Sequence, residues 1–169
     1  AKNNELQPIA MGSVLPFFKE NVITIGSENF AFEGTAVHSK AGLSRSKILE
    51  NALLYINSPY LWGGKSPFGI DCSGLTQMVY KIAGKKLPRD AYQQAEIGTT
   101  LSFVEESEDG DLAFFDNEEG SIIHVGILMN ENEIIHASGK VRIDKIDDRG
   151  ILNVDTSEYS HDLAFIKRV

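Results

Sequence analysis

The chain contains one cysteine, Cys72, among its 169 residues, and this scarcity excludes an internal disulfide. A long apolar run is also missing, so we expect no membrane span. The N-terminal sequence AKNNELQPIAMGSV lacks a basic segment followed by an apolar stretch, and we therefore expect no signal peptide in it. Neither the single thiol nor the missing leader indicates the compartment in which the protein works.

Positive charge is scarce as well, with 16 Lys and Arg against 24 Asp and Glu and a formal net charge of −8. Nucleic-acid-binding proteins neutralise phosphates with Lys and Arg, so this balance argues against nucleic acid as a partner. What remains is the composition of an ordinary globular protein, with 42% hydrophobic and 24% charged residues.

The chain divides into a β-rich N-terminal segment with a linker, residues 1–42, and a larger domain, residues 43–169. β-Forming residues cluster between positions 14 and 37, and residues 26–29 supply a turn between two runs. A segment this short cannot bury a core of its own. We therefore expect it to pack on the larger domain or to be the end of a small β-domain. The sequence HSKAGLSRS, which begins at His38, is typical of a linker.

Two amphipathic helices are predicted in the first half of the larger domain. Ser44 suits the N-cap of the first helix, which should end at Ser58-Pro59. Its apolar face, at helical spacing, consists of Leu49, Ala52, Leu53 and Ile56. Glycine and proline then predict a loop over residues 62–70. The second helix follows Asp71 as N-cap and should end at Gly84, so that Cys72 lies in its first turn.

The second half of the larger domain is predicted to be mostly β-sheet. A short helix begins near Asp90, and beyond Asp109-Gly110 apolar runs alternate with tight turns. These runs are DLAFF, HVGILM, EIIHAS, KVRIDKI and LAFIKRV. Short strands joined by tight turns favour an antiparallel sheet, and helices followed by strands place the fold in the α+β class.

The single cysteine is either a structural residue of the core or a reactive group. Free cysteine is most often a small core hydrophobe. At a helix N-terminus, however, the unpaired N–H groups favour a thiolate, although the neighbouring Asp71 opposes this effect. A nearby imidazole would matter more for reactivity.

Two of the four histidines, His124 and His136, bracket a predicted hairpin turn at residues 130–132. If they lie opposite each other or one residue off, their Cβ atoms are about 5 Å apart, and one imidazole can orient the other as a base. The alternative is an incidental pair on a solvated sheet face. We expect His38 and His161 to be structural or exposed.

Six short motifs, taken together, resemble the NlpC family of bacterial cell-wall cysteine peptidases, which have a papain-like fold. The resemblance runs from about Arg45 to the C-terminus, with the motifs in the family's order. They are YLWGG (60–64), DCSG (71–74), LPRDAYQQ (87–94), GDL (110–112), HVG (124–126) and HAS (136–138). The resemblance implies that Cys72 is the nucleophile, His124 the general base and His136 the residue that orients it. It implies neither a metal nor another cofactor.

The resemblance also implies a substrate, a peptidoglycan stem peptide or muropeptide cut between D-glutamate and the following diamino acid. Residues 1–42 resemble the end of a bacterial SH3-type domain, and relatives with such a domain release L-Ala-γ-D-Glu from peptides with a free N-terminal L-Ala. Most of that domain is missing from this chain. A bacterial protein is implied, in the cell envelope or in the cytoplasm.

Several residues near the nucleophile are candidates for substrate binding. Asp90 is the candidate for the free amine, and Arg89 for a glutamate carboxylate, unless it forms a structural ion pair with Asp71 or Asp90. Ser73 either bonds to substrate or stabilises the helix start. Asp71, next to the nucleophile, is a further candidate for substrate binding. The remaining candidates are Tyr60, whose hydroxyl could join the Cys72 N–H in an oxyanion hole, and Trp62, which is more often a packing residue.

Three other functions are compatible with the same residues. Cys72, His124 and His136 could supply three zinc ligands, although no metal-binding spacing such as C-x-x-C or H-E-x-x-H accompanies them. A papain-like acyltransferase or amidase would use the same residues with a different acceptor. A non-catalytic wall-binding module would have no evident need for all three.

Overall fold

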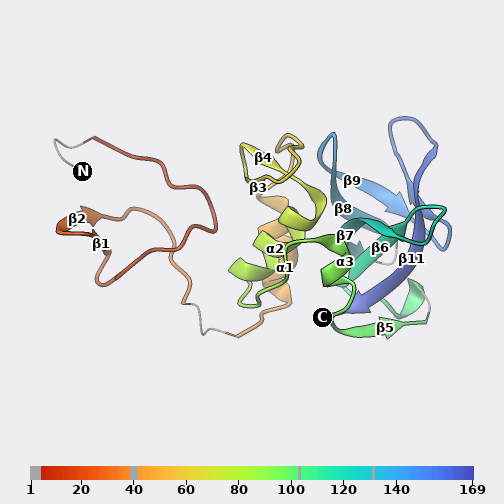
Figure 1. Cartoon of the computed structure of the whole chain (residues 1–169), viewed down its shortest axis with the longest axis horizontal. Helices are drawn as coiled ribbons and strands as arrows, with labels where there is room; N and C mark the ends of the chain where they lie inside the picture. Colours follow the sequence, from red (N-terminus) through yellow and green to blue (C-terminus); the bar gives the residue numbers. More distant parts are fainter. Residues whose placement is uncertain (1–4, 39–41, 103, 131) are drawn as a thin grey trace.

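The computed structural model describes residues 5–38, 42–102, 104–130 and 132–169, so positions 39–41 of the predicted linker and Glu131 of the predicted turn lie outside the described residues. Figure 1 shows a small hairpin joined to a larger body in which helices lie on one side of a curved sheet. The helices are α1 (Ser46–Leu53), α2 (Cys72–Ile82), α3 (Ala91–Gln94) and the short 3₁₀ helix η2 (Val104–Glu106). The strands are β1 (Val22–Ile25), β2 (Glu28–Ala31), β3 (Lys65–Ser66), β4 (Gly69–Ile70), β5 (Thr99–Leu101), β6 (Leu112–Asp116), β7 (Ile122–Asn130), β8 (Glu133–Ser138), β9 (Lys140–Ile146), β10 (Gly150–Leu152) and β11 (Tyr159–Arg168).

Seven strands of the described residues form one sheet in the order β10-β9-β8-β7-β6-β11-β5, and all its pairings are antiparallel. Since β10 also pairs with β11, six of these strands close into a ring and β5 is added to β11 outside it. The prediction of an antiparallel sheet in an α+β fold is confirmed. Neither β5, β10 nor the closure was expected, because short strands leave little trace in an apolar pattern.

Strand β6 is buried on both faces of the sheet, which explains its continuous apolar run. Leu112 and Phe114 pack with α1 and α2, whereas Ala113 and Phe115 belong to a second cluster on the opposite face. This second cluster draws residues from β6 to β11 and fills the inside of the closed sheet. Helix α2 contacts both β7 and β8, so its N-terminus lies against the strands that carry His124 and His136.

The first helix differs from the prediction at both ends. It begins at Ser46 with Arg45 at the N-cap and no side-chain cap, so Ser44 as N-cap is wrong. The Ser44 hydroxyl lies 3.2 Å from the Ser46 hydroxyl instead. The helix ends at Leu53, before Ser58-Pro59, and Leu53 is exposed. Its buried face is formed by Ile48, Asn51 and Ala52, because the helix packs one residue position away from the predicted stripe.

Helix α2 starts and stops where the sequence predicted. The Asp71 side chain accepts a hydrogen bond of 2.7 Å from the Gly74 N–H, and Gly84 has the positive φ of 104° that ends many helices. The preceding loop is more ordered than expected, since β3 and β4 form a small hairpin within residues 62–70. Asp90 forms a capping box with Gln93 at the start of α3.

The N-terminal segment forms a two-stranded hairpin of β1 and β2. Its turn consists of Gly26 and Ser27 only, because Glu28 and Asn29 already pair as strand residues. The segment touches the larger body through Lys81, whose ammonium group donates to the Gly12 carbonyl at 2.7 Å. Among the described residues no helix is long and apolar enough to cross a membrane.

Candidate active site

Cys72 is the first residue of α2 and is 7% exposed. Burial raises the pKa of its thiol above the ordinary value of 9.0, and the charge of Asp71 raises it further. The backbone N–H of Val125, on the neighbouring strand, favours the thiolate but does not reverse the shift. The thiol is therefore neutral near pH 7, so a base is needed to activate it.

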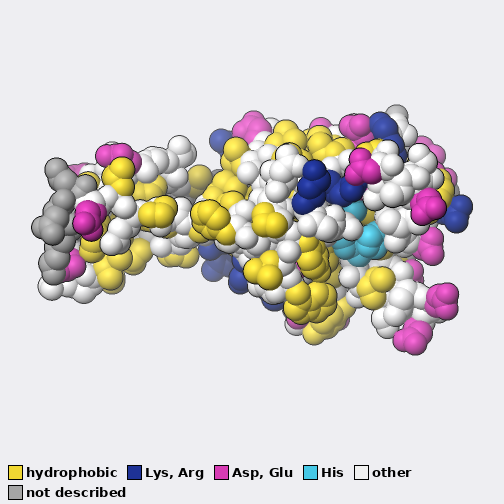
Figure 2. All heavy atoms as spheres, turned by 90° about the horizontal axis from the view of Figure 1, so that it is seen from above, with side chains coloured by type: hydrophobic (Ala, Val, Ile, Leu, Met, Phe, Trp, Pro, Cys, Tyr) yellow, Lys and Arg dark blue, Asp and Glu magenta, His cyan; other side chains and the backbone are white. Residues whose placement is uncertain are grey.

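The predicted nucleophile and the predicted base line one pocket of about 200 Å³. Figure 2 shows histidine side chains reaching the surface on this side of the larger body. The pocket is lined by Tyr60, Cys72, Ile123, His124, Ala137, Ser138, Gly139 and His161. Among the hydrogen bonds of the described residues, none joins the Cys72 sulfur to an imidazole. The pocket thus brings together Tyr60, Cys72 and His124 and leaves room beside them for a peptide group.

His124 and His136 are hydrogen-bonded to each other, with His124 Nε2 2.8 Å from His136 Nδ1. The two histidines were expected opposite each other or one residue off. This register is wrong, because His136 pairs with Gly126, two residues from His124. Continuation of the Asn130–Glu133 pairing would oppose His136 to Ile127, and the register shift between Leu128 and Asn130 moves its partner to Gly126. Two residues along a strand return to the same face, so the rings still meet as diagonal neighbours.

Gly126 makes this meeting sterically feasible. A Cβ added there would lie 3.0 Å from the Cβ of His136 and 2.6 Å from Cδ1 of Ile134. A side chain at position 126 would therefore force the Ile134 side chain, or the strand that carries His136, to shift.

Burial lowers the pKa of His124 well below its ordinary value of 6.5, and the neighbouring His136 and His161 lower it further. His124 is therefore a neutral imidazole near pH 7. Since Nε2 is engaged by His136, Nδ1 is the nitrogen left to accept a proton from the thiol.

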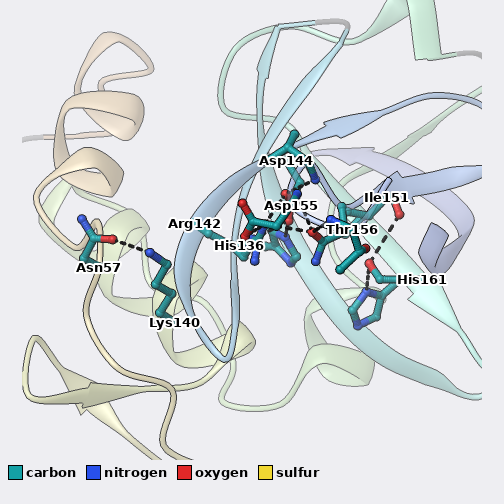
Figure 3. Close-up of polar contacts among 12 residues, drawn as sticks. Asn57, His136, Lys140, Arg142, Asp144, Ile151, Asp155, Thr156 and His161 are labelled. Atoms are coloured by element: carbon teal, nitrogen blue, oxygen red, sulfur yellow. Dashed lines mark hydrogen bonds and ion pairs between the residues drawn. The ribbon is translucent and has the colours of Figure 1, made fainter. Parts of the chain in front are cut away.

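Behind His136 lies an ion pair that the sequence analysis missed. His136 Nε2 is 2.9 Å from Oδ2 of Asp144, and Arg142 Nη2 donates to Oδ1 of Asp144 at 2.8 Å. Figure 3 shows how these three side chains, all from β8 and β9, point toward one another. The alternation of polar and apolar residues in VRID (141–144) places Arg142 and Asp144 on the face of His136, and this was the available signal.

His161 was expected to be structural or exposed, but it lines the pocket and stacks on His124. The ring centroids are 4.1 Å apart and the rings are inclined by 23°. Burial lowers the pKa of His161 to about 4, and the neighbouring His136 lowers it further. No motif near His161 could have revealed this contact, because it depends on the pairing of β11 with β6, the strand beside β7.

Asp71, Ser73 and Arg89 form one hydrogen-bonded cluster beside the nucleophile. Arg89 donates to both Asp71 oxygens, and its Nη1 also donates to the Ser73 hydroxyl at 2.9 Å. Burial alone would raise the pKa of Asp71, but the bonds from Arg89, Gly74 and Gly63 hold it below its ordinary value. The structural ion pair between Arg89 and Asp71 is therefore present.

The other two candidates for substrate binding are exposed. Asp90 lies at the start of α3, and Trp62 is 84% exposed, so packing in a core is wrong for this tryptophan. Both side chains are accessible to a substrate.

Zinc ligation receives no support from this geometry. The nitrogens of His124 and His136 that face each other are bonded together and do not point at a shared ion. Over the described ranges no cluster of three His, Cys, Asp or Glu residues has the arrangement of a metal site.

Comparison with known proteins assigns the family. The profile of the NlpC/P60 family matches residues 57–158, more than half of the chain. The chain belongs to the NlpC/P60 family. The predicted resemblance is thereby confirmed for the larger domain, and the matched range includes Cys72, His124 and His136.

Named relatives of this NlpC/P60 chain include two bacterial peptidases. A γ-D-glutamyl-L-lysine dipeptidyl-peptidase of Bacillus subtilis (strain 168) is 37% identical over 133 residues, which is 74% of this chain and 45% of the relative. A protein named dipeptidyl-peptidase 6, of Lysinibacillus sphaericus, is 35% identical over 123 residues, 71% of this chain and 41% of the relative. The chain thus spans less than half the length of these relatives.

Solved structures give the same fold. The NlpC/P60 domain of the peptidoglycan hydrolase SagA matches with a TM-score of 0.60 and 28% identity, over 75% of this chain and all of that domain. An NlpC/P60 protein of Bacillus cereus matches with a TM-score of 0.69 over 91% of this chain and 53% of its own. The latter is 23% identical, so it supports the fold alone.

Proposed function

We propose that the protein is a cysteine peptidase that hydrolyses the bond between D-glutamate and the following diamino acid in peptidoglycan stem peptides, releasing L-Ala-γ-D-Glu. The observation that carries this proposal is the pocket in which a thiol at a helix N-terminus and a neutral, hydrogen-bonded imidazole lie together. The name of the Bacillus subtilis relative supports the choice of bond.

In the proposed mechanism, Cys72 attacks the γ-glutamyl carbonyl carbon while its proton moves to Nδ1 of His124. The burial of both groups favours the neutral pair before attack over a preformed thiolate–imidazolium pair. The carbonyl oxygen becomes an oxyanion, which the Cys72 N–H at the start of α2 and the Tyr60 hydroxyl stabilise.

His124 then gives its proton to the leaving amine as the C–N bond breaks, and a thioester with Cys72 remains. Water attacks the thioester, His124 accepts a proton from that water, and the thiol is regenerated as the acid leaves.

We assign the glutamyl portion of the substrate to the Asp71–Ser73–Arg89 cluster, because it adjoins the nucleophile and has a partly exposed guanidinium. Asp90, exposed at the start of α3, is assigned to the N-terminal amine, and Trp62 to the substrate wall. We further assign residues 1–42 to an SH3-type domain of a longer chain, for which the β1–β2 hairpin is the supporting feature.

The test uses the peptide L-Ala-γ-D-Glu-L-Lys with and without an acetyl group on its alanine, with products identified by mass spectrometry. We expect L-Ala-γ-D-Glu and lysine from the unblocked peptide only. Cys72→Ala should abolish release while leaving the circular dichroism spectrum unchanged. Turnover by this variant would refute the nucleophile, and equal cleavage of the blocked peptide would refute the requirement for a free amine.

The same mass analysis distinguishes a hydrolase from an acyltransferase. With a second amine added, an acyltransferase would give a new amide of L-Ala-γ-D-Glu, whereas a hydrolase gives the acid alone. Asp90→Asn should raise KM for the unblocked peptide, because one charge of the proposed amine pair is removed.

A further inference from the structure

The Asp144 carboxylate collects hydrogen bonds from three N–H groups inside the closed sheet. His136 Nε2 lies 2.9 Å from Oδ2, whereas Arg142 Nη2 and the backbone N–H of Val154 donate to Oδ1 at 2.8 Å and 3.0 Å. Arg142 Nε adds an ion-pair contact of 2.7 Å to Oδ2. The carboxylate is 1% exposed.

Burial alone would raise the pKa of Asp144, but the bonds from His136, Arg142 and Val154 hold it far below its ordinary range. Asp144 is therefore ionised near pH 7, and an ionised carboxylate only accepts hydrogen bonds.

The acceptor at Asp144 dictates where the protons lie on both rings. His136 must donate from Nε2, so in its neutral form Nδ1 carries the lone pair. His124 Nε2, 2.8 Å from that lone pair, must then be the donor of the bond between the rings. Consequently the lone pair of neutral His124 is on Nδ1.

We propose that Asp144, held by Arg142, is a positioning residue that sets the tautomers of both imidazoles and so reserves Nδ1 of His124 for the proton of Cys72. This inference rests on the proposed function and adds a fourth member to Cys72, His124 and His136. When the thiol proton reaches Nδ1, the hydrogen bonds from His124 to His136 and from His136 to Asp144 keep their direction. The His124 imidazolium therefore forms without reorganisation of these side chains.

The surroundings of Arg142 show that this carboxylate is not interchangeable with its neighbour. Arg142 also pairs with Asp155 at 2.9 Å and donates to Asn153 at 3.1 Å. Asp155 is exposed and has no bond to His136, whereas Asp144 touches both Arg142 and His136. Figure 3 shows Asp144, Asp155, Arg142 and His136 in one cluster of side chains. Asp155→Asn is therefore the matched control for Asp144→Asn.

The first experiment measures the tautomers directly in the wild-type protein. Ring ¹⁵N-labelled histidine is incorporated, and long-range ¹H–¹⁵N spectra near pH 7 identify the protonated nitrogen of each ring. His38→Gln and His161→Phe variants assign the remaining signals. We expect Nε2–H tautomers for His124 and His136, and an Nδ1–H tautomer for either would overturn the proposal.

The second experiment replaces the carboxylate by an amide. In the Asp144→Asn variant, the amide oxygen should take the place of Oδ1, because both Arg142 and the Val154 N–H donate there. The NH₂ group then faces His136. His136 must then accept at Nε2 and carry its proton on Nδ1, and His124 must reverse in turn. We expect kcat of Asp144→Asn to fall by about 10²-fold or more with KM within about twofold, as when the orienting carboxylate of a triad is amidated.

The outcomes separate the inference from the function on which it rests. Asp155→Asn should keep the wild-type kcat and tautomers. Equal kcat in the two variants, or a loss confined to KM, would overturn the positioning role. Expected tautomers in a wild-type protein that cleaves no stem peptide would refute the proposed peptidase and leave the assignment of protons intact. Should Asp144→Asn fail to fold, the wild-type spectrum still decides.

Discussion

His161 should make the protein sensitive to acid, and replacing it by phenylalanine should remove part of that sensitivity. The imidazole stacks on His124 at 4.1 Å between centroids and lies 6.0 Å from the ring of Phe115. Phenylalanine preserves the stack but cannot be protonated. Among the hydrogen bonds of the described residues, the variant loses the 2.9 Å bond between His161 Nδ1 and the Ser160 hydroxyl.

The size of the effect follows from the pKa of His161, which burial lowers from 6.5 to about 4 in the folded chain. At about 1.4 kcal/mol per pH unit this corresponds to about 3 kcal/mol, and we expect about 2 kcal/mol because the ring is only partly buried. The unfolded chain binds the proton first. Stability is therefore complete above the unfolded pKa of 6.5 and is lost as pH falls toward about 4.

The assay is urea unfolding near pH 7 and near pH 4, followed by far-ultraviolet circular dichroism, since exposed Trp62 makes fluorescence a poor reporter of unfolding. The wild-type free energy of unfolding should fall by about 2 kcal/mol more than that of His161→Phe across this range. His38→Phe, at an exposed position of the N-terminal segment, should follow the wild type. Parallel curves for wild type and His161→Phe would refute the reasoning.

Three further predictions concern the site itself. Because burial raises the pKa of Cys72, its alkylation by iodoacetamide should accelerate steadily up to about pH 9, and a plateau beginning below about pH 6 would indicate a preformed ion pair instead. Gly126→Ala should lower kcat and destabilise the fold by about 1 to 3 kcal/mol in thermal unfolding, because its Cβ meets His136 and Ile134; wild-type values would show that the strands can separate at no cost. Asp71→Ala should cost about 2 to 4 kcal/mol in urea unfolding, since it removes both the cap of α2 and the partner of Arg89, and a loss below about 0.5 kcal/mol would contradict both roles.

The sequence predicted the features that depend on local chemistry. Asp71 as N-cap, Gly84 at the end of α2 and the turn between β7 and β8 each follow from the conformational preference of one or two residues. Ser44 is not the N-cap of α1, because the N-cap is the next residue, Arg45. This start is consistent with the burial of Ile48 and Ala52 on the inner face of the helix.

The features that the sequence did not predict depend on contacts between distant segments. The offset between His124 and His136 is set by the pairing of Asn130 with Glu133 and the register shift next to it, which no pattern of apolar residues reveals. Asp144 and His161 join the site through the pairing of β9 and of β11 within the closed sheet. The burial of Asp144 and the partial burial of His161 result from this pairing of distant strands and cannot be predicted from the residues next to them in the sequence.

The base and the nucleophile belong to different layers of the molecule. His124, His136 and Asp144 lie on strands that are hydrogen-bonded to their neighbours around the closed sheet. Cys72 begins a helix that packs against this sheet. A displacement of that helix would change the gap between sulfur and imidazole and leave the hydrogen bond between the two imidazoles in place. The side chains packed between helix and sheet, among them Leu75 and Val125, therefore fix the distance between the thiol and the imidazole although they belong to the core.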